Sequence, residues 1–147
     1  MFAKPDWRFV LCASAVVAFA ALGVFSSAQA RSAPTRAPKS WDVQMTNAGG
    51  MVRFEPKEIT IAAGDTVKWT QTGGSHNIKF WVDSIPMGAL PLLRAAMKDT
   101  AATLETRRFP MGTAEYTIVF AGMPKGVYKY HCGPHLMRGM MASITVQ

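Results

Sequence analysis

The chain has 147 residues, of which sixteen are Lys or Arg, nine are Asp or Glu, three are His and two are Cys. This length suggests one domain and leaves little room for a second. The basic residues do not form a cluster interleaved with aromatic residues, and this argues against nucleic-acid binding.

The N-terminus has the features of a secretory signal peptide. Lys4 and Arg8 precede residues 9–25, which are almost all apolar or small, and the uncharged run closes on Ala28-Gln29-Ala30. A charged start, an apolar middle and an Ala-x-Ala end are typical of a signal that is removed on export. We therefore expect residues 1–30 to be cleaved, which gives a periplasmic protein with no stable membrane insertion. An uncleaved anchor is the alternative, because the run is marginally long enough to span a bilayer.

The predicted signal is followed by residues 31–40, which contain two prolines and no large apolar residue, as is typical of a flexible leader. The domain is then expected to comprise residues 41–147. Removal of the signal leaves 117 residues, a net charge of about +6 and one cysteine, Cys132. A single cysteine cannot make an intramolecular disulfide. In an oxidising compartment a lone thiol is a liability unless it is buried, coordinated or catalytic.

The domain sequence alternates between apolar and polar residues with a period of two, which predicts half-buried strands. The alternating segments are residues 58–61, 66–70, 76–82, 115–120, 126–131 and 142–146. Short strands separated by Gly and Pro turns indicate an antiparallel sandwich or barrel. Residues 91–102 are the exception, because Leu92, Leu93, Ala96 and Met97 recur at roughly helical spacing. We expect a short helix or an irregular excursion there, covering one end of the sandwich.

Residues 130–141 carry the chemistry, since they contain one Cys, two His and three Met. A soft thiolate with imidazoles and a distant thioether suits copper better than calcium or magnesium, and blue-copper sites use two His, one Cys and a long axial Met. His135 and Cys132 come from this segment. His131 is adjacent to Cys132, so in an extended strand its side chain points to the opposite face. The second imidazole is then expected from His76, which follows a Gly-rich loop.

The pattern Cys132-x-x-His135-x-x-x-x-Met140 resembles the ligand loop of plastocyanins and pseudoazurins, which are type 1 (blue) copper proteins of the cupredoxin family. The resemblance extends upstream over most of residues 41–147, through Phe54-Glu-Pro56, Ile59-Thr-Ile61, Gly64-Asp-Thr-Val-x-Trp69, His76-Asn77-Ile78 and Asp83-Ser-Ile-Pro86. It implies an all-β Greek-key sandwich of about seven to eight strands. It also implies one copper ion per chain, with its ligands at His76, Cys132, His135 and Met140.

The sequence departs from the family in three respects. The stretch between His76 and Cys132 is longer than in a typical plastocyanin, with the extra length around residues 95–113. His131 occupies a position that is commonly Tyr in plastocyanins, and the net charge is positive where plant plastocyanins have acidic patches. By the same resemblance, the side chain of Asn77 is expected to tie the His76 segment to the Cys132 loop, although Asn is also an ordinary turn former.

The function implied by the resemblance is that of a soluble one-electron carrier, not an enzyme, in which copper cycles between Cu(I) and Cu(II). We expect a monomer whose redox partners carry an acidic docking surface, because complementary charge raises association rates. Apolar residues around His135 are the expected electron port, namely Met51, Pro134, Leu136 and Met137.

Two other functions deserve comparison with electron transfer. A periplasmic protein for copper delivery or storage is the alternative, with a thioether-rich site formed by Met137, Met140 and Met141. A copper enzyme with a second metal centre would need more histidines than the three available. A zinc site is disfavoured because catalytic zinc rarely uses this ligand set.

Overall fold

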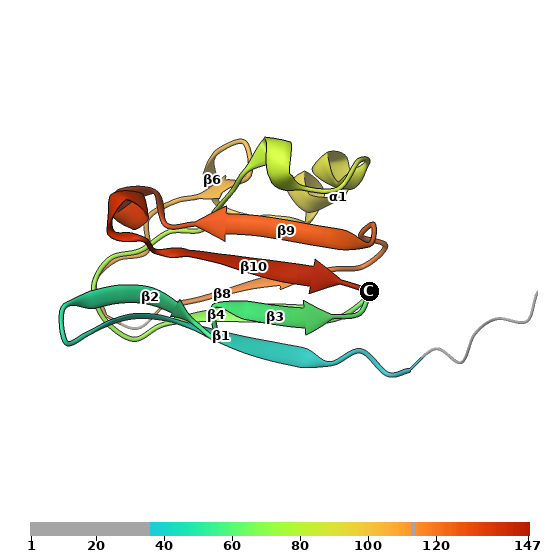
Figure 1. The fold of residues 1–147 in the computed structure, drawn as a ribbon. Coiled ribbons are helices and arrows are strands. Elements are labelled where there is room, and N and C mark those ends of the chain that lie inside the picture. Colours follow the sequence, from blue (N-terminus) through green and yellow to red (C-terminus); the bar gives the residue numbers. More distant parts are fainter. Residues whose placement is uncertain (1–35, 113) are drawn as a thin grey trace, which may run out of the picture. The chain divides into compact units, whose positions relative to one another are not determined.

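The domain consists of two β-sheets, which Figure 1 shows one behind the other. A computed structural model of the protein describes residues 36–112 and 114–147. The four-stranded sheet has the order β2 (Met51–Glu55), β1 (Ser40–Ala48), β4 (Thr66–Gln71) and β8 (Ala114–Val119). The six-stranded sheet has the order β3 (Glu58–Ile61), β10 (Met141–Val146), β9 (Gly126–His131), β5 (Lys79–Phe80), β7 (Glu105–Thr106) and β6 (Thr100–Ala102). The predicted all-β sandwich is confirmed. Seven of the strands found in the described residues have four residues or more, and β5, β6 and β7 are shorter.

Two strand pairs are parallel, which the antiparallel prediction missed. β1 pairs with β4 in parallel, and β3 pairs in the same way with β10. The other pairs are antiparallel. Alternation along a strand depends on which face is buried and carries no information about the direction of the neighbouring strand, so the sequence could not distinguish these pairs.

The core between the sheets is rich in aromatic side chains and packs against the strand β9, which leads to the predicted ligand Cys132. β4 buries every second residue, including Trp69, which is fully buried. The Trp69 ring meets the rings of Tyr130 and Phe80 edge to face, with centroid distances of 5.6 and 6.5 Å. Such pairs contribute about 0.5–1.5 kcal/mol each beyond the burial of area. Because Tyr130 lies two residues before Cys132, this packing fixes the end of β9.

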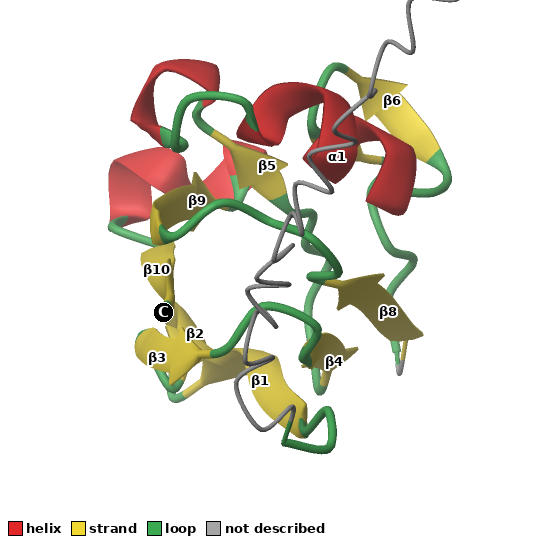
Figure 2. Ribbon diagram, turned by 90° about the vertical axis from the view of Figure 1, so that its right-hand side faces the viewer, coloured by secondary structure: helices red, strands yellow, loops and turns green. Residues whose placement is uncertain are grey.

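The structure shortens two predicted elements. Residues 76–82 were predicted to form a strand, but only Lys79–Phe80 joins the sheet as β5, followed by a 3-10 turn at Val82–Ser84. The helical excursion is confirmed as α1 (Ala89–Ala96), which starts before the predicted range and ends earlier, so that residues 100–102 form β6 instead. The shift agrees with Pro91, because a proline is tolerated in the first turn of a helix. Figure 2 shows α1 beside β5 and β6.

The predicted signal peptide, residues 1–30, lies outside the described residues, so its cleavage stays a prediction. The end of the leader is attached to the domain: the backbone N–H of Lys39 donates to Oδ1 of Asp65 at 2.8 Å, and Arg36 pairs with the same carboxylate. Within the part of the chain that the structure describes, no helix is long and apolar enough to cross a membrane.

Candidate metal centre

Three of the predicted ligands meet at one end of the sandwich. Nitrogen or sulfur atoms of His76, Cys132 and His135 all lie within 4.8 Å of one another. The Cys132 Sγ is 3.8 Å from Nδ1 of His76 and 3.3 Å from Nδ1 of His135. The side chains of His76 and Cys132 are buried, whereas His135 is partly exposed. The cluster therefore has a closed interior and one imidazole at the surface.

Met140 lies beside this cluster at the end of the same loop. The backbone N–H of Cys132 donates to the carbonyl oxygen of Met140 at 3.0 Å, and the N–H of Met140 donates to that of His135 at 3.2 Å. Met140 is fully buried, while Met137 is 96% exposed and Met141 is 38% exposed. Of the three methionines in the segment, only Met140 is thus buried against the cluster.

The loop between Cys132 and Met140 is a compact turn. Residues Gly133–Arg138 form a 3-10 helix that starts with Pro134 in its first turn and ends at Gly139 with φ of 78°. A left-handed backbone conformation favours glycine, and the fixed φ of proline suits a helix start. Figure 1 shows this turn at the same end of the sandwich as the β1–β2 turn. Arg138 joins the two turns by donating to the carbonyl oxygen of Gly50.

His76 is held by main-chain and side-chain hydrogen bonds on both sides. Its Nε2 lies 2.8 Å from the carbonyl oxygen of Gly73. Because a carbonyl can only accept, Nε2 carries the proton and Nδ1 faces Cys132 with its lone pair. The backbone N–H of His76 donates to Oε1 of Gln71 at 3.0 Å, and the N–H of Phe109 donates to the carbonyl oxygen of His76 at 2.8 Å.

Gln71 was not identified from the sequence. It is fully buried, and its amide nitrogen donates to the carbonyl oxygens of Pro110 and Gly112. The amide therefore connects the His76 segment to the extra length between the two ligand segments. That extra length also supplies Thr106, which accepts the N–H of Ile78 at its hydroxyl oxygen at 3.0 Å. A glutamine at the end of a predicted strand gives no signal for such a role.

Asn77 makes the expected link between the two ligand segments. Its Oδ1 accepts the N–H of Gly133 at 2.8 Å, directly after Cys132. Its Nδ2 donates to Oε1 of Glu105 at 3.0 Å. Glu105 is a second residue that the sequence did not reveal, because nothing in its neighbours indicates that it returns to the ligand segments.

The charges around the site favour neutral imidazoles. Burial lowers the pKa of His76, and His135 and Arg108 lower it further against the hydrogen bond to Gly73. Burial also lowers the pKa of His135, as do Arg138 and Arg108. Neutral imidazoles are the form that binds metals.

The thiol shows the opposite effect, since burial raises the pKa of Cys132. The backbone N–H groups of Asn77 and His135, together with Arg108, act in the other direction. Metal binding to this thiol then releases its proton, because a thiolate is the ligand.

His131 does not belong to the cluster. It stacks on Trp81 with ring centroids 4.2 Å apart, and it pairs across the sheet with Met141. This contact places His131 apart from the group formed by His76, Cys132 and His135, as expected for the neighbour of Cys132 in an extended strand.

The donors present suit a type 1 copper centre. A thiolate, two imidazoles and a buried thioether form the set that such centres use. The Nε2–carbonyl hydrogen bond of His76 is the outer interaction that fixes the tautomer of a metal-bound histidine.

Comparison with known proteins points to the same metal. The sequence model of the family described as copper binding proteins, plastocyanin/azurin family, matches residues 41–147. The plastocyanin of Prochlorothrix hollandica is 30% identical over 147 residues, which cover 99% of this chain and 98% of the relative. The plastocyanin of Nostoc punctiforme is 32% identical over 117 residues, covering 78% of each chain. Among solved structures, oxidized plastocyanin from Dryopteris crassirhizoma is similar with a TM-score of 0.51 at 29% identity, covering 73% of this chain and 100% of that one.

Proposed function

The chain belongs to the plastocyanin/azurin family of copper-binding proteins, and from this premise we propose that it carries single electrons between redox partners through one type 1 copper centre. The observation that supports this most directly is the convergence of one buried thiol and two imidazoles within 4.8 Å.

The proposed ligands are His76, Cys132, His135 and Met140. Bound copper supplies a one-electron couple between Cu(I) and Cu(II). The protein's part is to hold these four side chains in nearly the same positions in both states. The hydrogen bonds to His76 and the tie between Asn77 and Gly133 support such rigidity. Small rearrangement on electron transfer favours a carrier over an enzyme with a substrate pocket at the metal.

His135 is the proposed point of electron entry and exit. It is the only proposed ligand that is not fully buried. Apolar side chains near its end of the sandwich are open to solvent, including Met51 at 64% and Met137 at 96% exposure. A partner that covers these methionines would exclude water around the imidazole and bring its own redox centre close.

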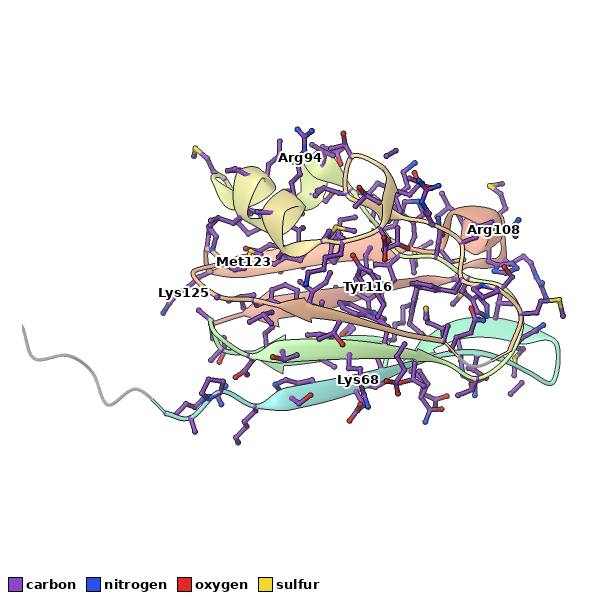
Figure 3. All side chains as sticks on the ribbon, turned by 180° about the vertical axis from the view of Figure 1, so that it is seen from behind. Lys68, Arg94, Arg108, Tyr116, Met123 and Lys125 are labelled. Atoms are coloured by element: carbon purple, nitrogen blue, oxygen red, sulfur yellow. The ribbon has the colours of Figure 1, made fainter. Side chains whose placement is uncertain are left out.

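The proposed partners carry acidic groups at their docking surface. Arg108 and Arg138 act on the pKa of His135, so positive charge lies around the proposed port. Figure 3 shows Arg108 at one end of the domain and Lys125 at the other. Complementary charge chiefly raises the rate of association, so partner reduction should slow as ionic strength increases.

The proposed location is the periplasm, reached through cleavage of residues 1–30, and the proposed state is a monomer. Copper storage through clustered thioethers receives less support. Met140 is buried in the site, while Met137 projects into solvent with 96% of its surface exposed.

Addition of Cu(II) to the purified protein tests the proposal. We expect one copper per chain and an intense visible charge-transfer band from the Cys132 thiolate, which disappears in Cys132→Ser. A colourless copper complex, or a Cys132→Ser variant with an unchanged band, would contradict it. Binding of several Cu(I) ions without colour would favour storage.

A further inference from the structure

A charge pair lies beside the tie that joins the two ligand segments. Lys79 on β5 and Glu105 on β7 face each other across the sheet, and Lys79 Nζ is 2.9 Å from Oε2 of Glu105. The other carboxylate oxygen, Oε1, accepts the amide N–H of Asn77 at 3.0 Å. Both oxygens of Glu105 are therefore occupied. Its side chain is 21% exposed, compared with 43% for Lys79.

Asn77 transmits the position of this carboxylate to the Cys132 loop. A carboxylate can only accept and a backbone N–H can only donate, so one orientation of the Asn77 amide satisfies Glu105 and Gly133 together. The N–H of Gly133 requires Oδ1 to face the loop, and the Glu105 carboxylate accepts from Nδ2 on the other side, so both contacts favour the same orientation. Glu105 therefore anchors the Asn77 side chain in the orientation that the loop needs.

The carboxylate also lies close to the residue that follows the thiolate ligand. A methyl group built on Gly133 would be 3.7 Å from Oε1 of Glu105 and 3.5 Å from Oδ1 of Asn77. The negative charge of Glu105, which is mostly shielded from water, thus lies close in space to Gly133, the residue that follows Cys132. Partial burial increases its influence, because the effective dielectric constant is lower than in water.

We propose that Glu105 and Lys79 set the reduction potential of the copper centre, with Glu105 acting as a positioning residue for Asn77 and as a source of charge. This inference rests on the proposed function. The negative charge of Glu105 favours Cu(II), and the positive charge of Lys79 favours Cu(I), when one electron is exchanged with a partner. Their pairing holds the potential between the values that either charge alone would give.

The test is the reduction potential of three copper-loaded variants of the full chain, measured against the unmodified protein. Glu105→Gln keeps an acceptor oxygen for Asn77 and removes the charge, so the potential should rise. Lys79→Met removes the opposing charge, so the potential should fall. The double variant should return close to the unmodified value. Unchanged potentials in both single variants, or shifts of the same sign, would overturn the proposal.

Ionic strength separates charge from structure. The shifts should shrink as salt is added, because mobile ions screen these partly exposed charges. Shifts that do not depend on salt would assign Glu105 a purely structural role and overturn the electrostatic part of the proposal.

Glu105→Ala adds a test of positioning, because it removes the acceptor oxygen as well as the charge. In the diamagnetic Cu(I) form, the NMR signals of the Asn77 side-chain amide should therefore move further in Glu105→Ala than in Glu105→Gln. Equal signals in the two variants would contradict a positioning role.

A matched control uses an ion pair of the same composition on the other sheet. Lys68 on β4 lies 3.7 Å from Glu115 on β8, and the hydrogen bonds of neither side chain reach the ligand segments in the described residues. Lys68→Met and Glu115→Gln should change the potential less than the corresponding variants of Lys79 and Glu105. Equal shifts would mean that net charge alone matters. If the unmodified protein failed to form the coloured site, the proposed function would fail; a coloured site with unchanged potentials would defeat only this inference.

Discussion

The imidazole of His76 donates from Nε2 to the carbonyl oxygen of Gly73, at 2.8 Å, and so presents Nδ1 to Cys132. Gly74 lies close to the same ring nitrogen. A Cβ atom added at Gly74, where φ is +79°, would be 3.0 Å from the same Nε2. The loop before His76 therefore requires glycine for two reasons, its left-handed backbone and the ring packed against it.

Gly74→Ala is expected to displace the His76 ring and weaken copper binding. Backbone strain and the close contact both act on the loop, so the visible band should shift or lose intensity, and Cu(II) affinity should fall about tenfold or more. Absorption spectra and a competitive copper titration measure both effects. Gly122→Ala is the control, since its φ is +66° and no atom of the described residues lies within 4 Å of the added Cβ. A normal spectrum in Gly74→Ala would show that the loop can move without affecting His76.

Gln71→Met should destabilise the protein even without copper. The substitution keeps an unbranched side chain of similar length but leaves the N–H of His76 and the carbonyl oxygens of Pro110 and Gly112 without this partner. Leaving the buried N–H of His76 without a partner costs about 1–3 kcal/mol, whereas the two carbonyl oxygens belong to exposed residues and can bind water. We therefore expect a loss of about 1–3 kcal/mol in chemical denaturation. Gln44→Met serves as the control, because Gln44 is exposed on β1. Equal stability of the two variants would contradict the connecting role of Gln71.

The sequence predicts those parts of the site that depend on the spacing of residues along the chain. Cys132 and His135 lie three residues apart, and a chain with three histidines leaves His76 as the natural distant partner. Gln71 and Glu105 could not be found in this way. Their roles depend on where residues 105–112 return to the 71–77 segment, and that return is set by the pairing of β5 with β7.

The fold shows the same division between local and distant information. Period-two alternation gave β3, β4, β9 and β10 nearly to the residue, because burial of one face is a local signal. Residues 76–78 also appeared strand-like, but their backbone groups bind Gln71, Thr106 and Phe109 instead of forming a regular ladder. No local sequence pattern predicts that these backbone groups bond to side chains and loops instead of to a neighbouring strand.

A pair of methionine variants distinguishes the proposed axial ligand from its neighbour. Met140→Leu replaces a buried thioether with an apolar group, which removes a donor to Cu(II) and should raise the reduction potential and alter the visible band. Met137→Leu changes a side chain that is 96% exposed, so the spectrum and the potential should stay the same. Voltammetry and absorption spectra of both variants provide the comparison. A changed visible band in Met137→Leu, together with an unchanged band in Met140→Leu, would identify Met137 and not Met140 as the axial ligand.

Asp65 is expected to make the stability of the domain depend on pH in the acid range. Burial alone would raise the pKa of this carboxyl group, but hydrogen bonds from Lys39, Trp41, Ala62 and Arg36 hold it well below the ordinary value of 3.8. Because the pKa is lowered in the folded state, the stabilisation is fully present above about pH 5 and is lost as the pH falls through 3.8 and below. The unfolding free energy of the metal-free protein should therefore decrease in that range.

Asp65→Asn should remove this acid dependence and lower the stability at neutral pH by about 3 kcal/mol, since an almost fully buried carboxylate would be lost from its donors. Urea denaturation of both proteins between pH 3 and about pH 7 measures the difference. Asp42→Asn is the control, because Asp42 is 65% exposed and pairs with Lys68 at the surface, so its loss should cost less than about 1 kcal/mol. Stability curves for Asp65→Asn and the unmodified protein that stay parallel through the acid range would mean that other carboxyl groups carry the effect. In that case the contacts of Asp65 would hold residues 36–41 against the turn before β4 without a net contribution from its charge.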